Sequence, residues 1–181
     1  AVLGARPQHT RYNHEPSRLI IGKKCVIREH VTMHPGTAID SMETIVGNHG
    51  LFFAGAHVAH DCVIGDHCIL VNNVALAGHV QMDDWAIIGG YTGVHQHCRL
   101  GAHSYVGTMS KISQDVPAYV LADGRPAAPK MINVEGLSRR NFSPQEIKAL
   151  QKAYKLLYRN ELNLTDALAE MKLLAIDYPC I

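Results

Sequence analysis

The chain has 181 residues, of which 47% are hydrophobic and 18% are charged, and its formal net charge is +1. This composition predicts a globular fold with its own core and excludes an intrinsically disordered chain. The near-neutral charge gives no general attraction to nucleic acid, and no apolar run reaches the roughly 20 residues of a membrane span. We therefore expect a cytoplasmic protein without a signal peptide, without stable membrane insertion and without nucleic acid as a partner.

An apolar residue recurs at every sixth position from Val46 to Ile112. The members of this series are Val46, Phe52, Val58, Ile64, Leu70, Leu76, Met82, Ile88, Val94, Leu100, Val106 and Ile112. A small or β-branched residue, such as Ala56 or Ser104, follows each member by four positions. The spacing also includes four earlier residues and then slips by one residue at positions 40–45. These earlier members are Ile21, Ile27, Met33 and Ile39.

A period of six fits neither an α-helix nor strands joined by hairpins. It is typical of a parallel β-helix, in which each hexad forms one side of a triangular coil. Coils of 18 residues then stack at about 4.8 Å. Four cysteines fall in the small-residue position, and we interpret them as buried small side chains rather than metal or redox groups. These are Cys25, Cys62, Cys68 and Cys98. Five cysteines without a CxxC motif also favour a reducing compartment.

The six-residue pattern ends after Val116, and prolines at 117, 126 and 129 predict an irregular connector. Ser143, Pro144 and Glu146 then read as the N-cap, first-position proline and capping box of a helix. Asn163 begins a second helical pattern. We predict an all-β fold with a small α tail: a β-helix over residues 1–118, a connector over 119–142 and a helical region over 143–181.

Residues 18 apart lie on adjacent coils of such a fold, so His60 is expected over Gly78 and Asp61 over His79. A neutral imidazole can take a proton from a hydroxyl near neutral pH. A glycine N–H can donate to a developing oxyanion, and a neighbouring carboxylate can orient the imidazole. Outward histidines can also be simple corner residues, and we favour that reading for four of them. These four are His14, His49, His67 and His103. For His57, His60 and His79 we instead favour a functional role at the site.

Four segments closely resemble the UDP-N-acetylglucosamine 3-O-acyltransferase family. They are HVAHDCVIGDHCILVNNVALAGHV, IIGGYTGVHQHC, SQDVPAYV and INVEGLSRR. The resemblance implies a left-handed β-helix and a homotrimer with active sites between subunits. It also implies transfer of a 3-hydroxyacyl chain from acyl carrier protein to the 3-hydroxyl of UDP-N-acetylglucosamine, the first step of lipid A synthesis. This reaction would use direct attack, without a covalent intermediate, metal or cofactor, in a chain shortened at both ends.

The resemblance also assigns roles to residues of this sequence. His60 matches the general base, Asp61 its acidic neighbour, and Gly78 the glycine whose amide faces the thioester carbonyl. Thr108 stands where a small residue admits the end of the acyl chain, and His9 replaces an acid that usually meets the sugar. The other positions that match substrate-binding residues are Gln8, Arg11, His34, His57, His79, Gln96, Asn133, Glu135, Arg139 and Arg140.

Three alternatives remain open at this point. The N-acyltransferase that acts later in the same pathway shares the fold, the acyl donor and the histidine base, but residues 133–140 and the helical tail favour the O-acyltransferase. A zinc carbonic anhydrase on the same fold needs two histidines five residues apart, and only His9 and His14 have that spacing. A non-catalytic scaffold would have no reason to cluster four such residues at coil-stacking positions, namely His57, His60, Gly78 and His79.

Overall fold

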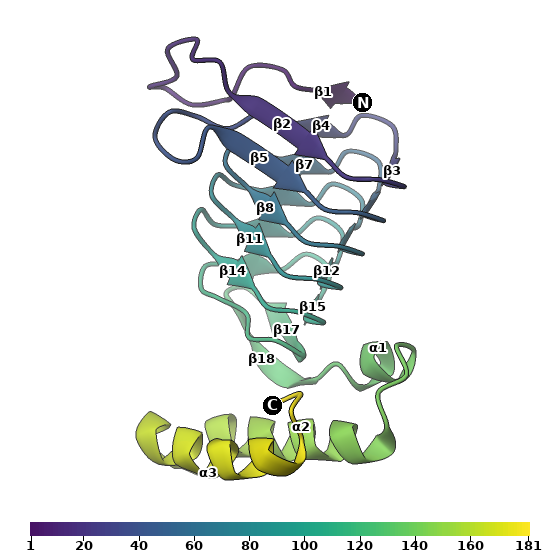
Figure 1. The fold of residues 1–181 in the computed structure, drawn as a ribbon, viewed down its shortest axis with the longest axis vertical. Helices are drawn as coiled ribbons and strands as arrows, with labels where there is room; N and C mark the ends of the chain where they lie inside the picture. The colour runs from purple at the N-terminus through teal and green to yellow at the C-terminus, as the bar shows by residue number, and fades with distance from the viewer. The chain divides into compact units, whose positions relative to one another are not determined.

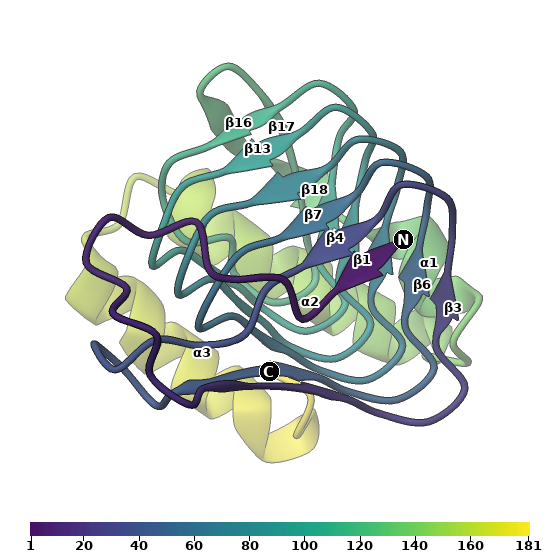
Figure 2. The same ribbon diagram turned by 90° about the horizontal axis from the view of Figure 1, so that it is seen from above.

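The first part of the chain is a stack of coils built from short strands (Figure 1). The computed structural model describes residues 1–181 and divides them into two compact units, Ala1–Pro129 and Lys130–Ile181. From β1 to β16, consecutive strands fall on three different sheets in turn, and the strand pairs from β1 to β17 are parallel. Seen from above in Figure 2, the coils overlie one another as a triangular solenoid. The parallel β-helix prediction is confirmed.

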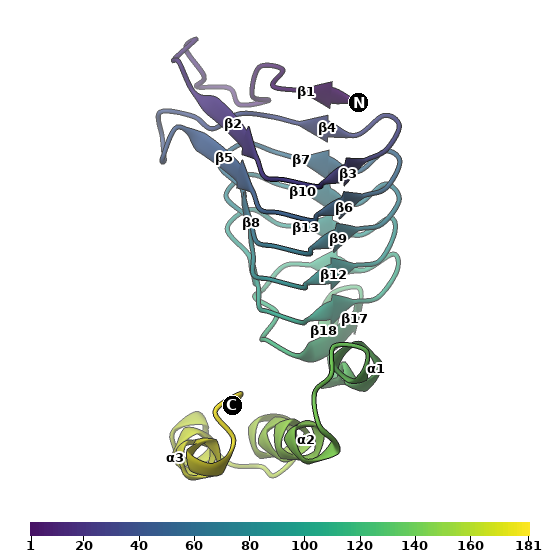
Figure 3. The ribbon, with the colours of Figure 1, turned by 45° about the vertical axis from the view of Figure 1, so that its right-hand side comes forward.

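Each side of the triangle is one sheet. Sheet 1 contains β1 (Val2–Leu3), β4 (Thr32–Met33), β7 (His57–Val58), β10 (Ala75–Leu76), β13 (Gly93–Val94) and β16 (Lys111–Ile112). Sheet 2 contains β2 (Arg18–Ile21), β5 (Glu43–Val46), β8 (Val63–Ile64), β11 (Gln81–Met82) and β14 (Arg99–Leu100). Sheet 3, whose stacked strands are visible in Figure 3, contains β3 (Val26–Ile27), β6 (Leu51–Phe52), β9 (Ile69–Leu70), β12 (Ile87–Ile88), β15 (Tyr105–Val106), β17 (Val120–Gly124) and β18 (Ala127–Ile132).

The six-residue series forms the interior of the solenoid. All twelve members from Val46 to Ile112 are at most 3% exposed, and the small residues four positions later are buried beside them. Residues 18 apart are paired in register, as Ala75 is with His57 and Gly93. Cys62, Cys68 and Cys98 are buried as predicted, whereas Cys25 is only partly buried, because it lies on a coil at the edge of the described stack.

The corners of the coils explain why histidine is abundant. One residue at each corner from His49 to Met109 has a left-handed backbone, with φ between 56° and 76°. Glycine adopts this conformation most readily. Among the other residues, it is most common for histidine, asparagine and aspartate. Seven of the twelve histidines occupy it: His14, His30, His49, His67, His79, His97 and His103. The left-handed conformation that the corners require therefore explains most of the corner histidines.

Two coils are longer than 18 residues. Thr32 on β4 contacts His57 on β7 across 25 residues, so this coil carries seven more than the standard repeat. The seven extra residues lie within the insertion loop, defined as residues 34–42, between β4 and β5. Ile39 lies in this loop and is 46% exposed. The prediction that Ile39 belongs to the apolar series, followed by a slip of one residue, is wrong: an inserted hexad plus one residue produces the same change of phase.

The segment predicted as an irregular connector is mostly regular. It contains β17, β18 and α1 (Val134–Ser138). Ala122 pairs with Val106 and is 3% exposed, so β17 extends the stack of sheet 3 without the six-residue spacing. Pro129 lies in β18, which ends the sheet order, and an edge strand tolerates the missing N–H of proline.

The second unit contains α1, α2 (Pro144–Tyr158) and α3 (Leu164–Asp177), of which α2 and α3 pack together. Ser143 caps α2 with both halves of the predicted capping box, and Pro144 occupies its first turn. Asn163 caps α3 through the Asp166 N–H. The predicted capping box of α2 and the predicted start of the second helix at Asn163 are confirmed. None of the helices has the length and apolar character that crossing a bilayer requires.

Candidate active site

A cleft of about 630 Å³ runs along sheet 1, bordered by strands β7, β10, β13 and β16 and by the N-terminal arm, residues 4–17. Seven predicted site residues line it: Gln8, His9, His34, His57, His60, Gly78 and Gln96. The 18-residue register brings those from the coils together, and the arm adds Gln8 and His9. Ile112 and Lys111 border the cleft further along the stack.

His60 and Asp61 form a buried hydrogen-bonded pair at the corner after β7. The His60 Nδ1 lies 2.8 Å from the Asp61 Oδ2, and the side chains are 10% and 0% exposed, respectively. A carboxylate only accepts hydrogen bonds, so Nδ1 carries the hydrogen in this contact. The other ring nitrogen, Nε2, is then left as the basic atom of the neutral imidazole.

Gly78 lies directly against the His60 ring. A Cβ at this position would be 2.4 Å from His60 Cε1 and 2.8 Å from Nε2, so any side chain here would displace the imidazole. The Gly78 N–H donates to no group of the chain. A basic nitrogen and an available amide donor therefore face the same part of the cleft.

Two further histidines line the cleft on neighbouring coils. The His57 Nδ1 is 2.7 Å from the Thr32 hydroxyl, and burial, then His34 and then His60, lowers the pKa of His57 below its usual value. His57 is therefore held in the neutral form at neutral pH. The His34 Nδ1 is 2.6 Å from the carbonyl of Arg6 and ties the arm to the coils.

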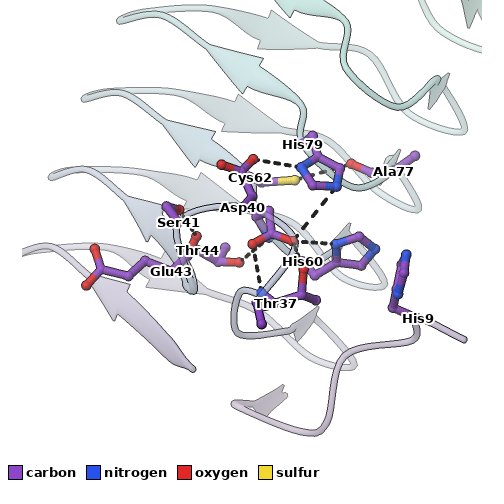
Figure 4. A network of polar contacts seen from close by, with 12 residues as sticks. His9, Thr37, Asp40, Ser41, Glu43, Thr44, His60, Cys62, Ala77 and His79 are labelled. Carbon is purple, nitrogen blue, oxygen red and sulfur yellow. Dashed lines mark hydrogen bonds and ion pairs between the residues drawn. The ribbon is translucent and has the colours of Figure 1, made fainter. Parts of the chain in front are cut away.

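The arm brings His9 against the base. The edge of one ring meets the face of the other, with centroids of His9 and His60 4.9 Å apart (Figure 4). Arg11, which donates its backbone N–H to His9 Nδ1, is exposed and does not line the cleft. His14 instead contacts Tyr12, with ring centroids 5.8 Å apart.

The His79 ring contacts the His60 ring, and His79 is not among the residues that line the cleft of the single chain. Its Nδ1 is 2.8 Å from Asp40 Oδ2, its Nε2 is 3.9 Å from Asp61 Oδ2, and its side chain is 12% exposed. Thr108 is exposed at a later corner and does not line the cleft of the single chain. The substrate-binding roles of His79 and Thr108 stay predictions.

The predicted nucleotide segment belongs to the second unit. Asn133 is buried and caps α1 through the Gly136 N–H, while Glu135 and Arg139 form an exposed ion pair one turn apart. Arg140 is the adjacent cation. The substrate contacts of these four residues stay predictions.

His60, Asp61 and His79 place possible metal-ligand atoms within 4.8 Å of one another. Every carboxylate oxygen of Asp61 is already hydrogen-bonded, to Thr37 and to His60, and the Nδ1 atoms of both histidines face carboxylates. The hydrogen bonds within this group already engage both oxygens of Asp61 and the Nδ1 atoms of both histidines. The group therefore fits proton transfer better than metal binding. Burial raises the pKa of Cys62 to about 12, which makes its thiol a poor nucleophile.

Comparison with known proteins identifies the family. A family model described as Udp N-acetylglucosamine O-acyltransferase, domain 2, matches residues 115–180. A curated relative from Pseudomonas paraeruginosa is named acyl-[acyl-carrier-protein]–UDP-N-acetylglucosamine O-acyltransferase. It is 55% identical over 177 residues, which are 98% of this chain and 69% of the relative. The chain belongs to the UDP-N-acetylglucosamine O-acyltransferase family.

Solved structures of the UDP-N-acetylglucosamine O-acyltransferase family agree with this assignment. The Moraxella catarrhalis protein is 44% identical, with a TM-score of 0.95 over 98% of this chain and 69% of that one. An Arabidopsis UDP-N-acetylglucosamine acyltransferase is 33% identical, with a TM-score of 0.90 over 98% of this chain and 65% of that one. The predicted family and the left-handed form of the β-helix are confirmed.

Sequence reasoning missed several polar residues around the base. Thr32 hydrogen-bonds to His57, Thr37 to Asp61 and Asp40 to His79. Thr37 and Asp40 fall near the break in the six-residue pattern. That break was the available signal for them.

Proposed function

We propose that this chain transfers a 3-hydroxyacyl group from acyl carrier protein to the 3-hydroxyl of UDP-N-acetylglucosamine, the first step of lipid A synthesis. The observation that supports this most is the arrangement of His60, Asp61 and Gly78 at the cleft. It puts a basic nitrogen and an unused N–H donor beside a cleft large enough for an acyl-pantetheine arm. Family membership and the named activity of the relatives select acyl transfer among the reactions that such a site could perform.

The mechanism begins at His60 Nε2, which removes the proton of the sugar hydroxyl as its oxygen attacks the thioester carbonyl. The new C–O bond forms a tetrahedral intermediate, whose oxyanion accepts a hydrogen bond from the Gly78 N–H. Collapse of the intermediate breaks the C–S bond, and the proton on His60 passes to the departing thiolate. Asp61 keeps the imidazole oriented and stabilises its charged form.

Substrate binding is assigned to the remaining predicted residues. We propose that Arg139 and Arg140 meet the pyrophosphate, because guanidinium groups offer paired charged donors. Asn133 and Glu135 would serve the nucleotide from the same segment, and Gln8, His9 and Gln96 would line the sugar and pantetheine path. The working form is a cytoplasmic homotrimer in which a neighbouring chain completes the cleft.

A direct assay tests this function. The 181-residue chain is incubated with UDP-N-acetylglucosamine and a panel of 3-hydroxyacyl carrier proteins, and acylated sugar nucleotide is measured. We expect product with at least one donor, and His60→Ala should reduce turnover by about 10²–10⁴-fold with an unchanged circular dichroism spectrum. Turnover of His60→Ala near that of the parent chain would show that His60 is not the base. Absence of product with every donor would contradict the proposed reaction.

A further inference from the structure

The insertion loop, residues 34–42, is the feature of the solenoid that the proposed mechanism leaves unexplained. It connects β4 to β5 and makes this coil 25 residues long instead of 18. In Figure 4, Thr37 and Asp40 project from this loop toward His60 and His79. Two residues that are 24 and 39 positions distant in sequence from their partners are thus brought to the base.

Thr37 donates a hydrogen bond to each oxygen of Asp61, the carboxylate that orients His60. Its backbone N–H donates to Asp61 Oδ1 at 2.7 Å, and its hydroxyl donates to Asp61 Oδ2 at 2.7 Å. The Asp61 side chain is fully buried, and a buried carboxylate is costly unless donors surround it. With both oxygens engaged by Thr37, the carboxylate has one orientation, and Oδ2 faces His60 Nδ1.

Asp40 acts on the second imidazole. Its Oδ2 accepts from His79 Nδ1 at 2.8 Å, which fixes the hydrogen on that nitrogen and the plane of the ring. The His79 ring then meets the His60 ring edge to face, with centroids 5.2 Å apart. Its Nε2 points toward Asp61 Oδ2 at 3.9 Å. Asp40 thereby fixes the orientation of the His79 ring, against which the His60 ring packs.

The loop is itself held tightly. A Cβ on Gly36 would be 2.1 Å from the Glu43 amide nitrogen and 2.8 Å from Asp61 Oδ1, so only glycine allows the approach. Glu15 of the arm accepts the Ala38 N–H at 2.9 Å, and that bond contributes most to holding the pKa of Glu15 below its usual value. The loop is therefore anchored on both sides of Thr37.

We infer that the insertion loop is the positioning element of the acyl-transfer site, with Thr37 holding the His60–Asp61 pair and Asp40 holding His79. We propose no contact with substrate for Thr37 or Asp40. The inference rests on the proposed function, because it names what keeps its base in place. It also accounts for the position of the break in the six-residue pattern, beside the one corner that carries the base.

Kinetics on matched variants test the inference. Thr37→Val removes the hydroxyl but keeps the shape and the backbone N–H, and Thr37→Ser keeps the hydroxyl. We expect Thr37→Val to lower kcat by about tenfold, the effect of one hydrogen bond to a charged group, with KM for the sugar nucleotide within twofold of the parent value. Thr37→Ser should restore most of kcat. Ser41→Ala, on the exposed side of the same loop, should leave kcat unchanged.

The pH dependence of the rate distinguishes a positioning role of Thr37 from a role in fold stability alone. The charged or titratable groups that face His60 are Asp61, His9, His57 and His79. Without the Thr37 hydroxyl, the Asp61 carboxylate is less neutralised and favours the protonated imidazole. The acidic limb of kcat/KM should then move to higher pH in Thr37→Val. A purely structural role predicts a lower melting temperature with an unmoved limb, and that result would overturn the inference.

Asp40 is tested by a second pair. Asp40→Ala removes the acceptor and should lower kcat severalfold, whereas Asp40→Asn keeps an acceptor oxygen and should recover part of the loss. Histidine ring ¹⁵N spectra provide a readout independent of turnover. The Nδ1–H signals of His60 and His79 should change in Thr37→Val and Asp40→Ala, respectively. If the chain lacks transferase activity, the proposed function fails while these spectra still test the loop. Unchanged Nδ1–H signals in both variants would overturn the inference.

Discussion

Gly78→Ala examines the closest contact at the site. The added methyl carbon would be 2.4 Å from His60 Cε1, whereas carbon atoms in ordinary contact are at least 3.4 Å apart. The ring must therefore retreat by about 1 Å, and a misplacement of about 1 Å of a reacting group costs on the order of 10²-fold in rate. Because His60 borders the open cleft, the imidazole can move outward at the expense of its 2.8 Å bond to Asp61, so the fold should survive.

Steady-state turnover and thermal unfolding measure the two halves of this prediction. We expect kcat of Gly78→Ala to fall at least 10²-fold, with a melting temperature within about 4 °C of the parent, which corresponds to a stability change of about 1 kcal/mol or less. Gly93→Ala is the matched control, because Gly93 also lines the cleft but an added Cβ there would meet no atom of the chain within 4 Å. It should keep kcat within about threefold, a change of under 1 kcal/mol in barrier. Turnover of Gly78→Ala equal to that of Gly93→Ala would refute the reasoning.

The remaining predictions concern binding, chain length and stability. Arg139→Ala should raise KM for the sugar nucleotide more than it lowers kcat, since the phosphates do not change in the reaction; an unchanged KM would remove Arg139 from the nucleotide site. Thr108→Gly should shift donor preference toward longer acyl chains in a competition assay, and an unaltered profile would place the length limit elsewhere. Ser143→Ala should destabilise the chain by about 1 kcal/mol through loss of the α2 cap, measured by chemical denaturation.

The interior of the solenoid was predictable because one physical constraint repeats along the chain. Every hexad must place one apolar residue inside, so Phe52 and Leu100 follow the same rule although they lie far apart. The register of 18 residues then follows from three sides per coil. It predicts His60 over Gly78, and the two residues are in contact in the structure. Helix caps were predictable for the same reason, since Ser143 and Asn163 act on their own neighbours.

Features that depend on non-repeating geometry escaped prediction. Ile39 looks like a core residue by spacing, yet the inserted loop carries it to the surface. Thr37 and Asp40 reach their partners only because the loop folds back, and no local pattern encodes that path. The contact between His79 and Asp40 depends on the same loop, and the predicted substrate-binding role of His79 stays a prediction.

One column of rings runs up a corner of the solenoid, in the order His49, His67, Trp85, His103 and Tyr119. Trp85 is the only tryptophan of the chain, and it stacks on His67 with centroids 3.9 Å apart and planes within 4°. Its fluorescence therefore reports on the stacking of adjacent coils alone. The helices of the second unit lack this fluorophore and are followed by far-ultraviolet circular dichroism. Comparing the two signals during denaturation would show whether the coils and the helices melt as one cooperative body or in separate steps.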